Sequence, residues 1–265
     1  MYAAAAVAFS LIASAVKIAG GVLFGSRALF VDALTCVANA VAVLGTVYYY
    51  RASLHPPDED HHYGHYRIGF TGVLVTLVAY SFVAGLSVAR LAAFESYTVS
   101  IYAPATATAG FVLYLASVLA SRKVGGFFAP YALFTVSELM ESTVVIASSL
   151  AGALYSFLID YAGAVAITAY IFYEVYETLR DVSVRISDVA PPPELLDVLY
   201  KELEGAGFLV KRARVRLVSE GVYHGDVVVV ADPSISIREV HERLEKVEES
   251  LRKHGLDVSI HVEPR

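Results

Sequence analysis

The 265-residue chain is far more apolar than a soluble protein, because 57% of its residues are hydrophobic and only 17% are charged, against about 25% charged residues in typical soluble domains. A single soluble core of this length could not bury so much apolar surface, so the composition indicates a membrane protein. The net charge of -6 argues against a nucleic-acid partner, and the single cysteine excludes an intramolecular disulfide framework.

Six apolar segments are long enough to form transmembrane helices. A helix needs about 20 residues to cross the hydrocarbon core, and in lipid only a helix satisfies every backbone group of such a run. We therefore predict six spans, near residues 2–24, 28–50, 68–92, 100–121, 128–156 and 158–179.

The second span carries three polar side chains on one face. Asp32, Thr35 and Asn39 are spaced i, i+3 and i+7, so their oxygens share one side of a helix. Ionisable groups inside a membrane are costly and usually face a protein interior, which makes this face a candidate ion site. The alternative is that Asp32 is a hydrogen-bonded packing residue near the helix end.

The loop before the third span contains three histidines and three carboxylates within the eight residues from Asp58 to His65. Neutral imidazole suits zinc and its transition-metal neighbours, and carboxylates widen the range towards iron, cobalt and manganese. The loop therefore predicts a divalent-metal site at a membrane surface. The alternative is a solvated acidic loop with incidental histidines.

The fifth span offers two carboxylates, Glu138 and Glu141, at i and i+3. If the second and fifth spans face each other, their oxygens form a plausible cation site near the midplane, and the carboxylates could also accept protons. As for Asp32, a packing role near the helix end is the alternative.

Basic residues are distributed unevenly over the loops. One side carries six of them and the opposite side carries only Arg27 and Arg90. The positive-inside rule then predicts that both termini and the histidine loop are cytoplasmic. The six residues are Arg51, Arg67, Arg122, Lys123, Arg180 and Arg185.

The pattern becomes that of a soluble domain at about residue 187, near the triple proline 191–193. We therefore predict two domains, 1–187 and 188–265. In the second, the order helix, strand, strand, helix, strand suits two helices packed on one face of a three-stranded sheet. The expected elements are residues 194–206, 210–217, 226–231, 235–254 and 256–262.

Four segments resemble the cation diffusion facilitators, a family of proton-coupled divalent-metal transporters. The run from Lys17 to Leu34 is similar to the family's signature across the first two spans, and Tyr63–Arg67 resembles its aromatic-glycine-histidine element. Residues 160–164 resemble the start of its sixth span, and residues 188–191 its junction to the cytoplasmic domain. Their order and spacing together carry the resemblance.

The resemblance implies a homodimer in the cell membrane, with six spans in each protomer and a ferredoxin-like cytoplasmic domain. It also implies one metal site between the second and fifth spans, and exchange of metal for protons by alternating access. The partners are then a second copy of the chain, the lipid bilayer, divalent cations and protons.

The resemblance places the membrane site at Thr35, Asn39, Glu138 and Glu141, with Asp32 as a further oxygen donor. The family usually has histidine or aspartate followed by aspartate on the second span, and this chain has neither. The site therefore lacks an imidazole and does not support the usual tetrahedral zinc site. An oxygen-rich site suits a harder or hydrated cation.

Two outer sites are also implied by the resemblance. In the loop, Asp58, His61 and His65 match the family's ligands in spacing. In the cytoplasmic domain, His241 resembles one ligand, and His261 with Glu263 resembles a histidine-x-carboxylate pair. Val228 stands at the corresponding position of the middle strand, so this last cluster is incomplete.

We expect a divalent-metal/proton antiporter that exports metal from the cytoplasm, with Zn, Fe, Mn, Co or Cd as the candidate ions. One alternative is a transport-impaired relative that acts as a membrane-anchored metal sensor or partner subunit. Another is a transporter of a monovalent or organic cation. An enzyme is not expected, because the sequence contains no nucleophile triad, phosphate-binding glycine loop or cofactor fingerprint.

Overall fold

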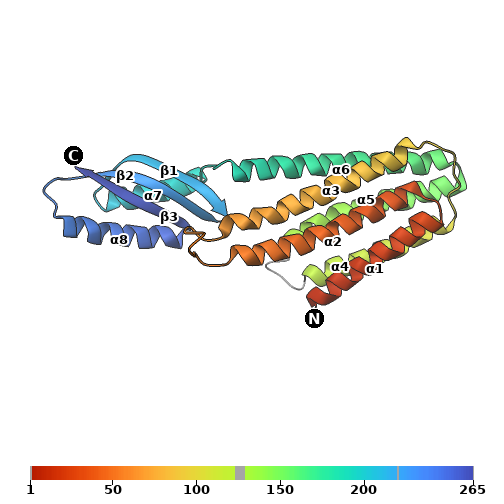
Figure 1. Ribbon diagram of the computed structural model, residues 1–265, viewed down its shortest axis with the longest axis horizontal. Coiled ribbons are helices and arrows are strands. Elements are labelled where there is room, and N and C mark those ends of the chain that lie inside the picture. The colour runs from red at the N-terminus through yellow and green to blue at the C-terminus, as the bar shows by residue number, and fades with distance from the viewer. Residues whose placement is uncertain (1, 123–128, 220, 265) are drawn as a thin grey trace. The chain divides into compact units, whose positions relative to one another are not determined.

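The computed structural model describes residues 2–122, 129–219 and 221–264, and gives side chains for residues 8–119, 138–219 and 221–264. Six long helices occupy the described part of the first 186 residues (Figure 1). This confirms the predicted helical fold class. The helices are α1 (Tyr2–Leu23), α2 (Arg27–Ser53), α3 (Gly69–Ala92), α4 (Tyr102–Arg122), α5 (Ala129–Leu154) and α6 (Phe157–Ile186).

Four described helices, α2, α3, α4 and α6, are long and apolar enough to cross a membrane. The described side chains of α1 form a shorter apolar stretch, Ala8–Leu23, and those of α5 are described only from residue 138. The chain is therefore a membrane protein by its helices, whereas six spans and cytoplasmic termini stay predictions.

Small residues allow the helices to approach closely. A Cβ added at Gly20 of α1 would lie 2.3 Å from Thr106 Oγ1 of α4, and one at Gly72 of α3 would lie 2.9 Å from the Cα of Thr46 in α2. Such short separations leave no room for a side chain. Figure 1 shows α1 and α4 side by side.

Asp160, in the first turn of α6, fixes the start of α2. Its carboxylate accepts hydrogen bonds from Ser26 Oγ at 2.6 Å, from the Arg27 backbone N–H at 2.8 Å and from the Tyr97 hydroxyl at 2.9 Å. A carboxylate at a helix N-terminus satisfies free N–H groups and complements the helix dipole. The contact therefore fixes the N-terminus of α2, the helix that carries the predicted polar face.

A second compact unit joins Ala52–Phe70 with Arg180–Arg265. The predicted boundary at residue 187 stays a prediction, since the structure groups the histidine loop with the C-terminal segment. Within this unit lie the short 3-10 helix η1 (Tyr66–Ile68), the helices α7 (Pro193–Gly205) and α8 (Ile237–Lys253), and the strands β1 (Leu209–Ser219), β2 (Val222–Ala231) and β3 (Leu256–Pro264).

The strands form a sheet in the order β1-β2-β3, antiparallel between β1 and β2 and parallel between β2 and β3. The parallel pair is connected through α8, whose N-cap Ser236 accepts a hydrogen bond from the Glu239 backbone N–H at 3.3 Å. The predicted α-β-β-α-β order is therefore confirmed. β2 begins four residues earlier than predicted, because Val222–Gly225 also pair with β1.

Alternation along the strands separates two faces of the sheet. Apolar side chains such as Val227, Val229 and Val258 pack with Leu203 of α7 and Leu251 of α8 in one core. The helices therefore cover this face, and the intervening strand residues lie on the other face.

Candidate metal sites

The helices α2 and α5 bring four of the predicted membrane-site residues together. Thr35 Oγ1 lies 3.2 Å from Glu141 Oε2, and the Asn39 side-chain amide donates a hydrogen bond to Glu138 Oε1. All four side chains are buried. We call Thr35, Asn39, Glu138 and Glu141 the oxygen cluster, because carboxylate, hydroxyl and amide oxygens are its possible ligand atoms.

Tyr80 of α3 also reaches this cluster, which the sequence analysis did not anticipate. Its buried hydroxyl donates a hydrogen bond to Asn39 Oδ1. Glu174 of α6 lies close enough to interact electrostatically with Glu141 and Tyr80. Glu174 was visible as an acidic residue in an apolar span, whereas nothing in the sequence distinguished Tyr80 from the other 17 tyrosines.

Asp32, the fifth predicted residue, is paired with a lysine. Lys17 Nζ of α1 lies 2.9 Å from Asp32 Oδ2 and 3.1 Å from Oδ1, and both side chains are fully buried. Ser142 Oγ donates to Asp32 Oδ1 at 3.2 Å. The carboxylate is thus held on the α1 side of α2 and joins the oxygen cluster only through neighbouring side chains.

The chemistry of the oxygen cluster follows from its charge. Glu138 and Glu141 interact electrostatically with each other in a site with little water. A buried carboxylate is costly unless its charge is compensated. A bound cation or protons would supply that compensation.

The loop residues Asp58, His61 and His65 form a second candidate site. Their ligand atoms lie within 4.8 Å of one another, and they are the only such group of three among the described residues. His61 Nδ1 and His65 Nε2 lie 3.3 and 3.4 Å from the Asp58 oxygens. His65 Nδ1 lies 3.2 Å from the Pro56 carbonyl, so the bond to the backbone can orient the imidazole with Nε2 towards a metal.

Neighbouring groups keep the Asp58 carboxylate in its ionised form, which is the form that binds a metal ion. Partial desolvation tends to raise its pKa, but hydrogen bonds from the backbone N–H groups of His61 and Asp60, together with nearby His65, lower the pKa below its usual value. The carboxylate is therefore ionised near neutral pH, as metal binding requires.

The three candidates in the sheet domain do not form a group of metal ligands in the described part of the chain. His241 lies on α8, whereas His261 is in register with Val228 on the strand face that alternates with the core. Glu263 binds Lys211 Nζ at 2.5 Å, and this hydrogen bond lowers the Glu263 pKa. A metal role for these residues stays a prediction.

Arg67 and Asp188 connect the end of the histidine loop to the start of the sheet domain within the second unit. Arg67 Nη2 lies 2.5 Å from Asp188 Oδ1, and Arg216 Nη1 lies 3.1 Å from Oδ2. Desolvation is the largest single influence and raises the pKa of Asp188, but the hydrogen bonds and charges of the two arginines together outweigh it and lower the pKa. All three side chains are about half exposed, so water screens the interaction.

Comparison with known proteins points to one family along most of the chain. Residues 3–186 match the family model of the cation efflux transmembrane domain, and residues 208–265 match that of the cation efflux protein cytoplasmic domain.

Three Bacillus subtilis proteins are similar over nearly their whole length. The manganese efflux system protein MneS is 28% identical, over 97% of this chain and 93% of its own. The manganese efflux system protein MneP is 27% identical, over 96% and 94%. The uncharacterized transporter YdbO is 26% identical, over 96% and 91%.

Proposed function

The chain belongs to the cation efflux family, and from this premise we propose that it exports Mn²⁺, or a divalent cation of similar ligand preference, in exchange for protons. Metal efflux follows from the family. The choice of ion and the coupling to protons are the proposal.

The oxygen cluster is the observation that carries the proposal. The groups on α2 and α5 that could bind a metal ion are two carboxylates, a hydroxyl and an amide. Carboxylate, carbonyl and water ligands suit manganese, magnesium and calcium, whereas zinc and copper favour sites with nitrogen or sulfur. The names of MneS and MneP, which describe manganese efflux, support the same ion.

The same contacts suggest how exchange would proceed. In the structure, Thr35 and Asn39 are hydrogen-bonded to Glu141 and Glu138. An entering cation would replace these hydrogen bonds with metal–oxygen bonds, and protons on the glutamates would replace the cation on release. With the histidine loop on the cytoplasmic side, its acidic residues would attract cations towards the transport pathway.

Replacement of Glu138 with Gln tests this mechanism. The amide keeps the size of the side chain but removes the charge, so we expect Mn²⁺ uptake into proteoliposomes to fall at least about tenfold. Glu95→Gln is the matched control, because this glutamate is exposed in the segment between α3 and α4. Undiminished uptake by Glu138→Gln would remove Glu138 from the mechanism.

A metal sensor is the second candidate, and the exposed group Asp58, His61 and His65 favours it. Such a protein would bind Mn²⁺ through the loop but would not move it across a membrane. Calorimetric titration of the full chain, run beside the uptake assay, separates the two functions. Binding that Glu138→Gln leaves unchanged, without uptake by the native chain, would identify the sensor.

A further inference from the structure

Lys17 is a fully buried cation within a helix that otherwise lacks charge. Its ammonium donates to Asp32 Oδ1 at 3.1 Å, to Ser142 Oγ at 2.7 Å and to Cys36 Sγ at 3.3 Å. These three residues belong to α2 and α5, the two helices that carry the oxygen cluster. The side chain of α1 therefore places its charge beside a site that lies between two other helices.

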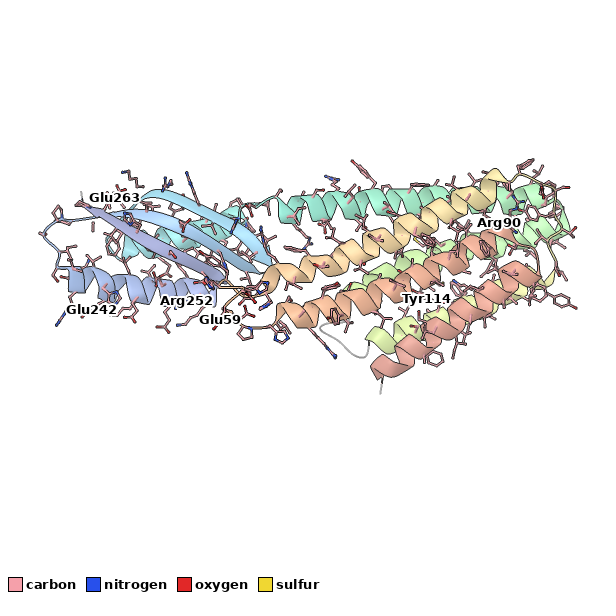
Figure 2. The ribbon with its side chains drawn as sticks, viewed as in Figure 1. Glu59, Arg90, Tyr114, Glu242, Arg252 and Glu263 are labelled. Carbon is pink, nitrogen blue, oxygen red and sulfur yellow. The ribbon has the colours of Figure 1, made fainter. Side chains whose placement is uncertain are left out.

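The stem of Lys17 is held in place by α4. A Cβ added at Gly110 would lie 2.6 Å from Lys17 Cγ, so the lysine passes directly over this glycine. The ring of Tyr114, which Figure 2 shows on α4, lies with its centroid 5.5 Å from the ammonium nitrogen. The ammonium is thus covered by protein on the side of α4 as well as bound by α2 and α5.

The ammonium and the oxygen cluster are only one side chain apart. Cys36 Sγ contacts Lys17 Nζ at 3.3 Å and Glu138 Oε2 at 3.8 Å. On the other side, Ser142 accepts from Lys17 and donates to Asp32, and it follows Glu141 directly in the sequence. A change of charge at Lys17 would therefore act on the cluster over a short distance with little water between.

We propose that the Lys17 ammonium is a tethered counter-cation that keeps Asp32 out of the metal site, so that two carboxylates rather than three hold the transported ion. The inference rests on the proposed function of the oxygen cluster. Ionised Asp32, Glu138 and Glu141 carry three negative charges, and Lys17 cancels one of them. The remaining two negative charges equal in magnitude the charge of one divalent cation. A further carboxylate, Glu174 of α6, approaches Glu141 and is partly exposed.

Without the ammonium, the site would bind the cation more tightly and release it more slowly, so transport would slow. Asp32 lies on the same face of α2 as Thr35 and Asn39, so its freed carboxylate could turn towards an ion at the cluster. A third carboxylate strengthens the attraction for a divalent cation and slows its release. A purely structural ion pair would have the opposite signature, because breaking it would disturb the site and weaken binding.

The test measures Mn²⁺ binding to the full chain by equilibrium dialysis, together with uptake into proteoliposomes. All variants carry Asp58→Asn, His61→Ala and His65→Ala, which remove binding at the loop. We expect Lys17→Gln to bind Mn²⁺ at least about tenfold tighter and to carry it into proteoliposomes more slowly. The reference is the Mn²⁺ affinity of the chain that carries only the three loop substitutions. The affinities of Lys17→Arg and of the double variant Lys17→Gln, Asp32→Asn should stay within about threefold of it.

Arg90→Gln is the matched control, because it removes one positive charge at an exposed position in the last turn of α3 (Figure 2) and should leave the affinity unchanged. If Lys17→Gln does not fold, Lys17→Met carries the test, because it removes the same charge and keeps an unbranched side chain. That variant should also bind Mn²⁺ at least about tenfold tighter.

A folded Lys17→Gln or Lys17→Met protein with unchanged or weaker Mn²⁺ binding would overturn the inference. In either case Mn²⁺ uptake by the native chain would leave the proposed function standing. A native chain that neither transports Mn²⁺ nor binds it once the loop ligands are removed would overturn both proposals.

Discussion

At the scale of single residues, His224 of β2 shows how the histidine loop contacts the sheet domain. Its imidazole lies near the rings of Tyr63 and Tyr66, with centroids 6.1 and 5.8 Å away. Asp257 approaches His224 Nε2 to 4.0 Å. Partial burial lowers the pKa of His224, Arg216 adds to this effect, and Asp257 opposes it.

The lowered pKa of His224 predicts a pH dependence of stability. Below about pH 6.5, the ordinary histidine pKa, the unfolded chain takes up a proton that folded His224 resists, so unfolding becomes easier. The stabilisation is complete above that pH and falls as the pH drops towards the folded pKa. We expect the thermal midpoint of the native chain, measured in EDTA from pH 7.5 to 5, to fall more than that of His224→Gln.

His254→Gln is the control for this measurement. His254 is exposed at the C-cap of α8, and its substitution also removes one histidine from the same unit. Its midpoint should follow that of the native chain across the pH range. Parallel curves for the native chain and His224→Gln would show that the local environment of His224 does not govern the pH response.

At the scale of elements, α3 contains two glycines in opposite surroundings. A Cβ at Gly72 would lie 2.9 Å from the Cα of Thr46 in α2, whereas a Cβ at Gly85 would meet nothing within 4 Å in the described structure. The backbone of α2 cannot yield as a flexible side chain would. The closeness of α2 and α3, which also brings Tyr80 to Asn39, thus depends on the missing side chain at Gly72.

The pair gives a matched test of helix packing. Gly72→Ala should lower the free energy of unfolding by roughly 1–3 kcal/mol through overpacking. Gly85→Ala should leave it unchanged or raise it by up to about 1 kcal/mol, because alanine favours the helix. Thermal midpoints of the detergent-solubilised chains would measure both. Equal midpoints for the two variants would contradict the close contact between α2 and α3.

At the scale of the whole molecule, self-association is the main prediction. The family model matched by residues 208–265 takes its name from dimer formation. In the C-terminal sheet domain, the side chain of Ile237 at the start of α8 is 90% exposed.

We therefore expect the purified full chain to be a homodimer. Light scattering corrected for bound detergent should give twice the chain mass of 28.5 kDa. The measurement is best made at several protein concentrations, because a dimer dissociates once the concentration falls below its dissociation constant. A mass of one chain at all concentrations would contradict the prediction and leave each site to be formed within a single protomer.

Features that depend on local patterns could be predicted from the amino-acid sequence. Apolar length predicted the membrane helices, and the sequence pattern after residue 187 predicted the order of helices and strands in the C-terminal domain. The family resemblance implied the loop group of Asp58, His61 and His65, and these three residues lie within eight positions of one another along the chain. Glu138 and Glu141 could be identified from their charge alone, since carboxylates are rare in apolar helices.

Which distant residues contact one another could be seen only once the helices were packed together. Lys17 and Asp32 are 15 positions apart and on different helices, and Tyr80 and Asn39 are 41 positions apart. Such contacts depend on how each helix is rotated about its axis and how closely it approaches its neighbours, and periodicity along one helix fixes neither. His241 and His261, which were already predicted on a helix and on a strand, lie on α8 and β3 and do not form one ligand group in the described chain.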